Sequence, residues 1–62
     1  MKLFRVHWDG RTASPFAEPL WVATITAAGD SGDASAVYRA LSALDIGQRY
    51  TDSYGDVWER EE

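Results

Sequence analysis

The chain has 62 residues, of which 45% are apolar and 26% are charged, and ten acidic residues against six basic ones give a net charge of −4. This length accommodates one domain with a thin core. The negative charge argues against general binding of nucleic acids or anionic membranes. Because cysteine is absent, disulfides, thiolate zinc sites and cysteine nucleophiles are excluded.

The same features bear on where the protein acts. No apolar run approaches the roughly 18 residues of a membrane span, and no stretch of signal length opens the chain. Small secreted domains usually carry disulfides, so their absence favours the cytoplasm. The chain starts with methionine, and we expect it to be a complete small reading frame.

Residues 2–8 predict a strand, because Phe4, Val6 and Trp8 alternate with polar positions before the turn dipeptide Asp9-Gly10. Residues 11–19 predict an irregular connection interrupted by two prolines. Within this connection, Phe16 is either an anchor into the core or an exposed contact.

A second strand is predicted over residues 20–28, a nearly continuous apolar run rich in β-branched side chains. A helix is predicted over residues 33–46, with Asp33 as its N-cap and Asp30 or Ser31 as earlier alternatives. Its apolar residues recur at helical spacing, and Gly47 is its expected stop.

Residues 48–52 and 57–60 predict a final hairpin around a turn that contains Gly55. Together these elements predict an α+β fold of ββαββ order, in which one helix packs on one face of a small antiparallel sheet.

Catalytic and ligand-binding patterns are weak in this sequence. His7 alternates with Arg5 and Asp9 on one strand face, but no serine lies in a nucleophile motif, so we expect no enzyme. Asp30 and Asp33 lack the ligand pattern of a calcium loop, and no lysine follows in the position of a phosphate-binding loop. We therefore expect neither a metal nor another cofactor.

Charge is distributed unevenly along the chain. Residues 1–29 carry a net charge of +1 and residues 30–62 carry −5. Acidic residues that alternate with large aromatic ones can steer toward a basic protein and anchor in it. The alternative is a solvated face that only maintains solubility. The predicted partner-binding residues are Asp30, Asp33, Asp52, Tyr54, Asp56, Trp58 and Glu59.

In its size, acidity and α+β pattern the chain resembles the anti-CRISPR inhibitors that phages make, although no motif is shared. The resemblance implies a non-catalytic protein that occupies the basic surface of a nucleic-acid-binding effector in the bacterial cytoplasm, in some cases by mimicking DNA. It implies a protein partner, neither direct nucleic-acid contact nor a membrane, and a monomer in preference to a dimer.

Two other functions remain open on the sequence. A self-associating module could pair through an open sheet face bearing Leu3, Leu20 and Val22, or through the edge of the first strand. A single-stranded nucleic-acid binder could stack bases on exposed aromatic side chains, next to a small basic group of Lys2, Arg5 and Arg11.

Overall fold

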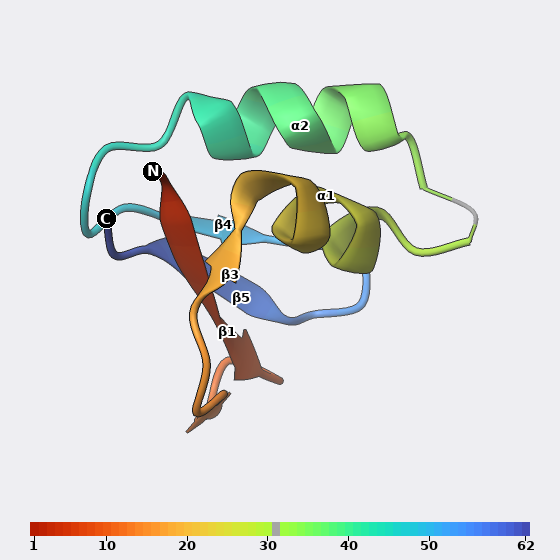
Figure 1. Ribbon diagram of the computed structural model, residues 1–62. Coiled ribbons are helices and arrows are strands. Elements are labelled where there is room, and N and C mark those ends of the chain that lie inside the picture. Colours follow the sequence, from red (N-terminus) through yellow and green to blue (C-terminus); the bar gives the residue numbers. More distant parts are fainter. Residues whose placement is uncertain (31) are drawn as a thin grey trace.

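The alternating residues near the N-terminus form the central strand of an antiparallel sheet in the computed structural model, which describes residues 1–30 and 32–62. Of the three residues that alternate on one face, Phe4 and Val6 point into the core, whereas Trp8 at the end of the strand is 44% exposed. In chain order the elements are β1 (Leu3–Trp8), β2 (Thr12–Ala13), β3 (Glu18–Pro19), α1 (Leu20–Ala28), α2 (Ala34–Ser42), β4 (Arg49–Thr51) and β5 (Val57–Arg60). The predicted α+β class is confirmed (Figure 1).

The sheet has the order β2-β1-β5-β4, and β3 also pairs with β1. β2 and β3 lie along the same edge of β1, where His7 pairs with Ala13 and Phe4 with Glu18. Four residues, 14–17, therefore stand opposite two residues of β1, and the chain bulges between β2 and β3. Phe16 is exposed on this bulge, so it is not an anchor into the core.

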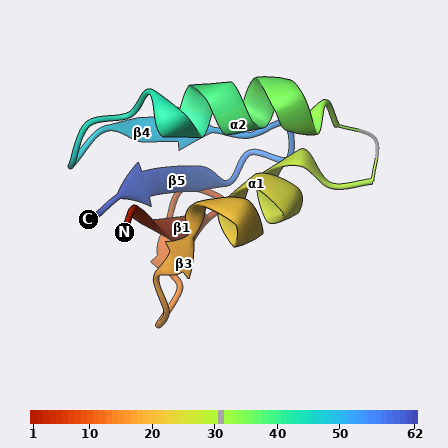
Figure 2. The same cartoon turned by 45° about the horizontal axis from the view of Figure 1, so that its top comes forward.

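The strand predicted over residues 20–28 is wrong, because this segment is helix α1. The order is therefore three strands, two helices and two strands, and both helices cover the same face of the sheet (Figure 2). The sheet face expected to carry Leu20 and Val22 does not exist. β1 is also no edge strand, since it pairs on both sides, and neither predicted route to self-association has a structural basis.

Small residues explain why this apolar run is helical. Ala23 and Ala27 are four positions apart and fully buried, with Thr24 and Ala28 beside them, so α1 can approach its neighbours closely. Pro19 precedes the first turn, where its fixed φ suits a helix start. An apolar run of this length is consistent with either a buried strand or a helix, and its β-branched residues favoured the wrong one.

The predicted helix over residues 33–46 is present as α2 but ends four residues earlier, at Ser42. Asp33 is its N-cap, as predicted, and accepts a hydrogen bond from the Ala36 amide at 3.2 Å. Ser31, one of the alternative caps, lies outside the described residues. The helix is capped by Ala43 in the αR conformation and not by Gly47, and Lys2 donates to the carbonyl of its last residue, Ser42.

The predicted hairpin is confirmed, with Tyr50 opposite Trp58 and Thr51 opposite Val57. Trp58 lies between the sheet and the helices. The largest buried apolar side chains in the described part of the chain come from three elements of the sheet–helix contact: Phe4, Leu41 and Trp58. The core of this protein is correspondingly small.

Gly29 ends α1 with φ 65° and ψ −163°, a backbone conformation adopted almost solely by glycine. A Cβ at this position would also lie 1.9 Å from the Tyr54 hydroxyl. Gly29→Ala should therefore destabilise the fold, by about 1–3 kcal/mol for the backbone conformation alone. The loss should show as a lower urea midpoint.

Gly47→Ala is the matched control, because Gly47 also has a positive φ, of 90°, but has no atom near the position of its Cβ. If the steric contact with Tyr54 matters, Gly29→Ala costs more than Gly47→Ala, and Tyr54→Ala recovers part of the difference. Equal losses in the two glycine variants would show that the Tyr54 contact contributes nothing.

Candidate functional site

The turn between β4 and β5 is organised around the buried carboxylate of Asp52. One of its oxygen atoms accepts hydrogen bonds from the Tyr54 and Asp56 amides at 2.9 and 3.0 Å. The other accepts from Nε1 of the Trp58 indole at 3.0 Å. Asp52 thus links the turn to the core and is not free to meet a partner.

Trp58 does not fit its predicted role as a partner anchor, because only 1% of its surface is exposed. It is the largest fully buried side chain among the described residues. The prediction of an accessible Asp52 is wrong for the same structural reason, since both groups are partners in one buried hydrogen bond.

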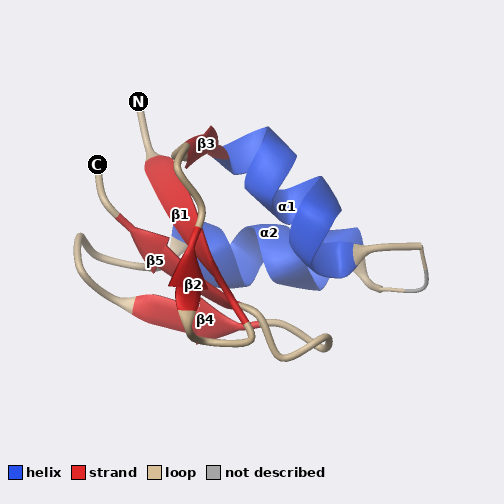
Figure 3. Cartoon of the chain, turned by 90° about the horizontal axis from the view of Figure 1, so that it is seen from below, coloured by secondary structure: helices blue, strands red, loops and turns tan. Residues whose placement is uncertain are grey.

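Three loops meet near this turn and carry four of the five remaining predicted residues: Asp30, Asp33, Tyr54 and Asp56. The Tyr54 hydroxyl lies against Gly29, at the start of the α1–α2 connection that also holds Asp30 and Asp33. On its other side, Asp56 accepts a hydrogen bond from the Asp9 amide at 2.9 Å. These loops lie away from the chain ends (Figure 3). We call three segments the acidic end: residues 9–11, residues 29–30 with 32–33, and residues 52–56.

The acidic end accounts for the whole net charge of the protein. Its three segments contain five aspartates and one arginine, a net charge of −4: Asp9, Asp30, Asp33, Asp52, Asp56 and Arg11. In the rest of the chain, five acidic residues balance five basic ones. Four of the seven predicted partner-binding residues lie here and are not buried in the core: Asp30, Asp33, Tyr54 and Asp56.

Glu59, the seventh predicted residue, lies on the outer face of the sheet instead. Its carboxylate is 2.8 Å from Arg49 Nε and 3.7 Å from His7 Nε2. Residues 58 and 59 are neighbours on a strand, so their side chains point to opposite faces and cannot form one patch. Glu59 belongs to a row of charges of both signs and not to the acidic end.

A second ion pair extends this row. Arg5 donates to both carboxylate oxygens of Glu61 and to the Ser14 carbonyl. The hydrogen bonds from Arg5 hold the pKa of Glu61 below its ordinary value, despite an opposing desolvation effect. The predicted face of Arg5, His7 and Asp9 is incomplete, because Asp9 leaves the strand in a turn with φ 53°.

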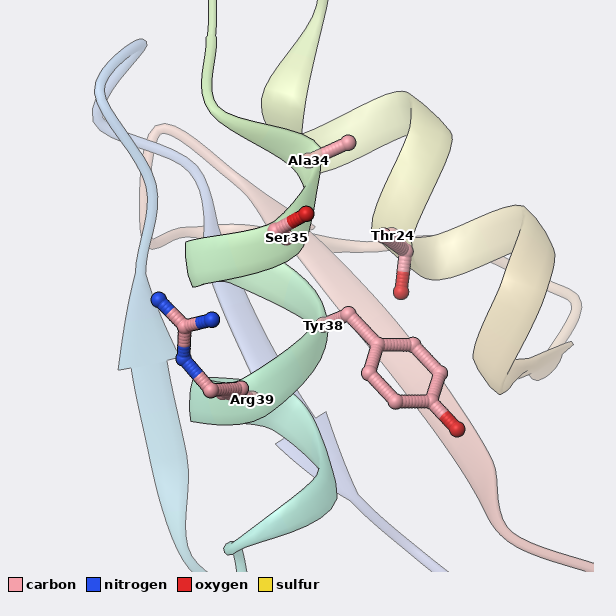
Figure 4. Close-up of a pocket in the computed structure, with 5 residues that line it drawn as sticks. All are labelled: Thr24, Ala34, Ser35, Tyr38 and Arg39. Atoms are coloured by element: carbon pink, nitrogen blue, oxygen red, sulfur yellow. The ribbon is translucent and has the colours of Figure 1, made fainter.

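Hollows on the surface are shallow. One, of about 410 Å³, lies between the helices and is lined by Thr24, Ala34, Ser35, Tyr38 and Arg39. Figure 4 shows that Tyr38 and Arg39 project to opposite sides of α2, so their polar groups do not converge on one ligand. Over the described residues, no three His, Asp or Glu side chains are grouped as metal ligands require.

Sequence reasoning missed Asp9 as part of the acidic end. The antiparallel register supplies the signal, because pairing of His7 with Val57 places the residues after β1 beside those before β5. It also missed the exposed aromatic residue of α1, Trp21, which requires that segment to be recognised as a helix.

In the described part of the chain, neither nine-residue helix is long enough to cross a membrane.

Asp52→Ala removes three hydrogen bonds and leaves the Trp58 indole N–H buried without a partner. We expect a loss of about 2–3 kcal/mol in the free energy of unfolding, measured by urea denaturation. Asp45→Ala is the control, since it removes an exposed carboxylate outside the acidic end. Equal stabilities of the two variants would contradict the organising role of Asp52.

The Arg5–Glu61 pair predicts a specific pH dependence. Since folding lowers the pKa of Glu61, its stabilising effect is complete above the unfolded value near 4.5 and is lost as pH falls through the folded pKa. The stability difference between the natural protein and Glu61→Gln should therefore shrink below about pH 4.5. The control makes the same change in an Arg5→Gln background, where the difference should no longer shrink with pH, because the donor that lowers the pKa of Glu61 is gone.

Comparisons of the chain with protein-family models, with curated proteins and with solved structures gave no match. No family is therefore assigned, and no residue role is transferred from another protein. Function has to be inferred from the charges, contacts and exposed side chains of this molecule.

Proposed function

We propose that this protein is a small non-catalytic inhibitor that occupies the basic, nucleic-acid-binding surface of another protein. The observation that carries the proposal is the gathering of the entire net charge in the acidic end, around the half-exposed Tyr54. A concentrated field of one sign attracts a surface of the opposite sign over several ångströms. Such a partner would be rich in lysine and arginine.

At the acidic end, charged residues and Tyr54 would make different contributions to binding. Asp9 and Asp30 would accelerate the encounter, because exposed charges at the rim of an interface act mainly on association. Tyr54 would then supply contact area, since 54% of its surface is exposed and its ring is held against Gly29. Asp52 would contribute indirectly by fixing the turn that presents Tyr54.

The partner class that we favour is a nucleic-acid-binding effector of a CRISPR system, which would make the protein a phage anti-CRISPR acting in the cytoplasm of the bacterial host. Support comes from the resemblance in size, acidity and α+β pattern, together with the acidic end. Carboxylates that replace DNA phosphates would displace the same counterions from a basic channel. The inhibition would be stoichiometric and would need neither a cofactor nor a metal.

The alternative of a single-stranded nucleic-acid binder has less support. Base stacking requires exposed aromatic rings on the open face of the sheet. The outward-pointing side chains of β1, β4 and β5 include no Trp, Tyr or Phe in the described structure: Leu3, Arg5, His7, Arg49, Thr51, Val57 and Glu59. Tyr50 and Trp58 face the helices instead.

Neutralising the acidic end tests the proposal. We expect the double variant Asp9→Asn with Asp30→Asn to restore CRISPR interference, measured by phage plaquing on a CRISPR-competent host that expresses the protein. An otherwise identical host without the effector genes is the reference. Asparagine tolerates the positive φ of residue 9, so the fold should be preserved. With a captured effector, association should slow by about tenfold at low salt.

The control variant combines Asp45→Asn with Glu62→Gln, which removes the same charge from outside the acidic end. It should inhibit as the natural protein does. Equal loss in both variants would contradict a local role for the acidic end. Failure of the natural protein to inhibit any system in a panel of CRISPR types would contradict the anti-CRISPR assignment.

A further inference from the structure

Helix α1 has an apolar outer face that no part of the described chain covers. Its nine residues include no charged side chain. One side, with Ala23 and Ala27, is buried, yet Trp21 and Ile25 on another side are 66% and 62% exposed. A helix that is apolar on all sides is normally buried on all sides. The exposed half of α1 is therefore typical of an interface.

The apolar face extends beyond α1 itself. Trp21 lines a groove of about 430 Å³ together with Tyr38 of α2 and residues at the start of the chain. The other lining residues are Met1, Lys2, Pro19 and Leu20. Tyr38 projects into the space between the helices (Figure 4). We define the α1 face by its four exposed large side chains: Met1, Trp21, Ile25 and Tyr38.

We propose that the α1 face binds a second copy of this chain and forms a two-fold symmetric dimer. Trp21 and Ile25 are one helical turn apart on the same side of α1. Two antiparallel α1 helices related by a two-fold axis between these positions would place Trp21 of each copy against Ile25 of the other. Such a contact is self-complementary, as symmetric dimers require.

The charge distribution favours dimer contact through the α1 face over dimer contact through the acidic end. Each molecule carries −4, concentrated in the acidic end, so two copies repel one another when these loops approach. The α1 face contains no acidic residue. The cation in its groove, Lys2, already donates to the Ser42 carbonyl. A dimer through α1 therefore joins the molecules without bringing like charges into contact.

The available area suits a weak dimer. Large aromatic side chains bury about 150–250 Å² each, so the four side chains of the α1 face offer roughly 500 Å² at their observed exposures. Two copies would bury about 1,000 Å², which is the lower limit for a specific interface. Association should therefore depend on protein concentration in the micromolar to millimolar range.

Because the core is small, burial of further apolar surface in a dimer would add to the stability of the fold. Five buried apolar side chains larger than alanine are present in the described structure: Phe4, Val6, Val37, Leu41 and Trp58. Eight large ones are exposed: Met1, Trp8, Phe16, Trp21, Ile25, Tyr38, Ile46 and Tyr54. Oligomerisation is a common solution for domains of this size.

Sedimentation equilibrium of the full chain, over concentrations from about 1 µM to 1 mM, tests the dimer. We expect a monomer–dimer equilibrium, and we expect Ile25→Lys to raise the dissociation constant by at least about tenfold. Ile46→Lys is the matched control, because Ile46 is 67% exposed but lies outside the α1 face. It should leave the equilibrium unchanged, and circular dichroism should show that both variants remain folded.

Three outcomes would overturn the proposal. The natural protein could remain monomeric at the highest concentration, or its dimer could be unaffected by Ile25→Lys. Ile46→Lys could also dissociate the dimer as strongly as Ile25→Lys. The proposal is independent of the inhibitor function, since Ile25 lies outside the acidic end, and a monomer that still inhibits would overturn the dimer alone.

Discussion

The hydrogen bond between the Asp52 carboxylate and the Trp58 indole is the interaction on which much of this small fold depends. It joins the largest buried side chain to the turn that carries Tyr54 and Asp56. A buried carboxylate is tolerated because three donors satisfy it. The conformation of the acidic end and the packing of the core are therefore consequences of the same group.

The molecule separates its charge from its apolar surface. Every unit of excess negative charge belongs to three loops, whereas α1 presents uncharged side chains to solvent. Elsewhere the carboxylates of Glu59 and Glu61 are paired with arginines. This division provides two surfaces of different chemistry, one suited to a basic protein and the other to a second copy, and a dimer through α1 would present two acidic ends.

Sequence patterns predicted the elements whose signals are local. The alternation in β1, the Asp33 cap and the final hairpin each depend on a few neighbouring residues, and all are present. The run of residues 20–28 was assigned wrongly because its apolar character fits a buried strand as well as a helix. The four-residue spacing of Ala23 and Ala27 identifies a helix only when the elements packed against this segment are known.

The candidate site was predicted in part for a similar reason. The loops that carry Asp30 and Tyr54 lie side by side, since the Tyr54 hydroxyl packs against Gly29. Trp58 and Glu59 could not both join them, since neighbours on a strand face opposite ways. Burial of Asp52 was beyond sequence reasoning, because it depends on a hydrogen bond to a core side chain.

The two edges of the sheet differ in a way that limits assembly. β4 is an ordinary edge strand, whereas the β2–β3 edge is broken by a bulge and contains two prolines, Pro15 and Pro19. Proline cannot donate to an added strand. Only β4 can therefore pair with a strand of another molecule. If two copies paired through β4, neither would have another edge available, so the assembly would stop at a dimer and could not grow into a fibre.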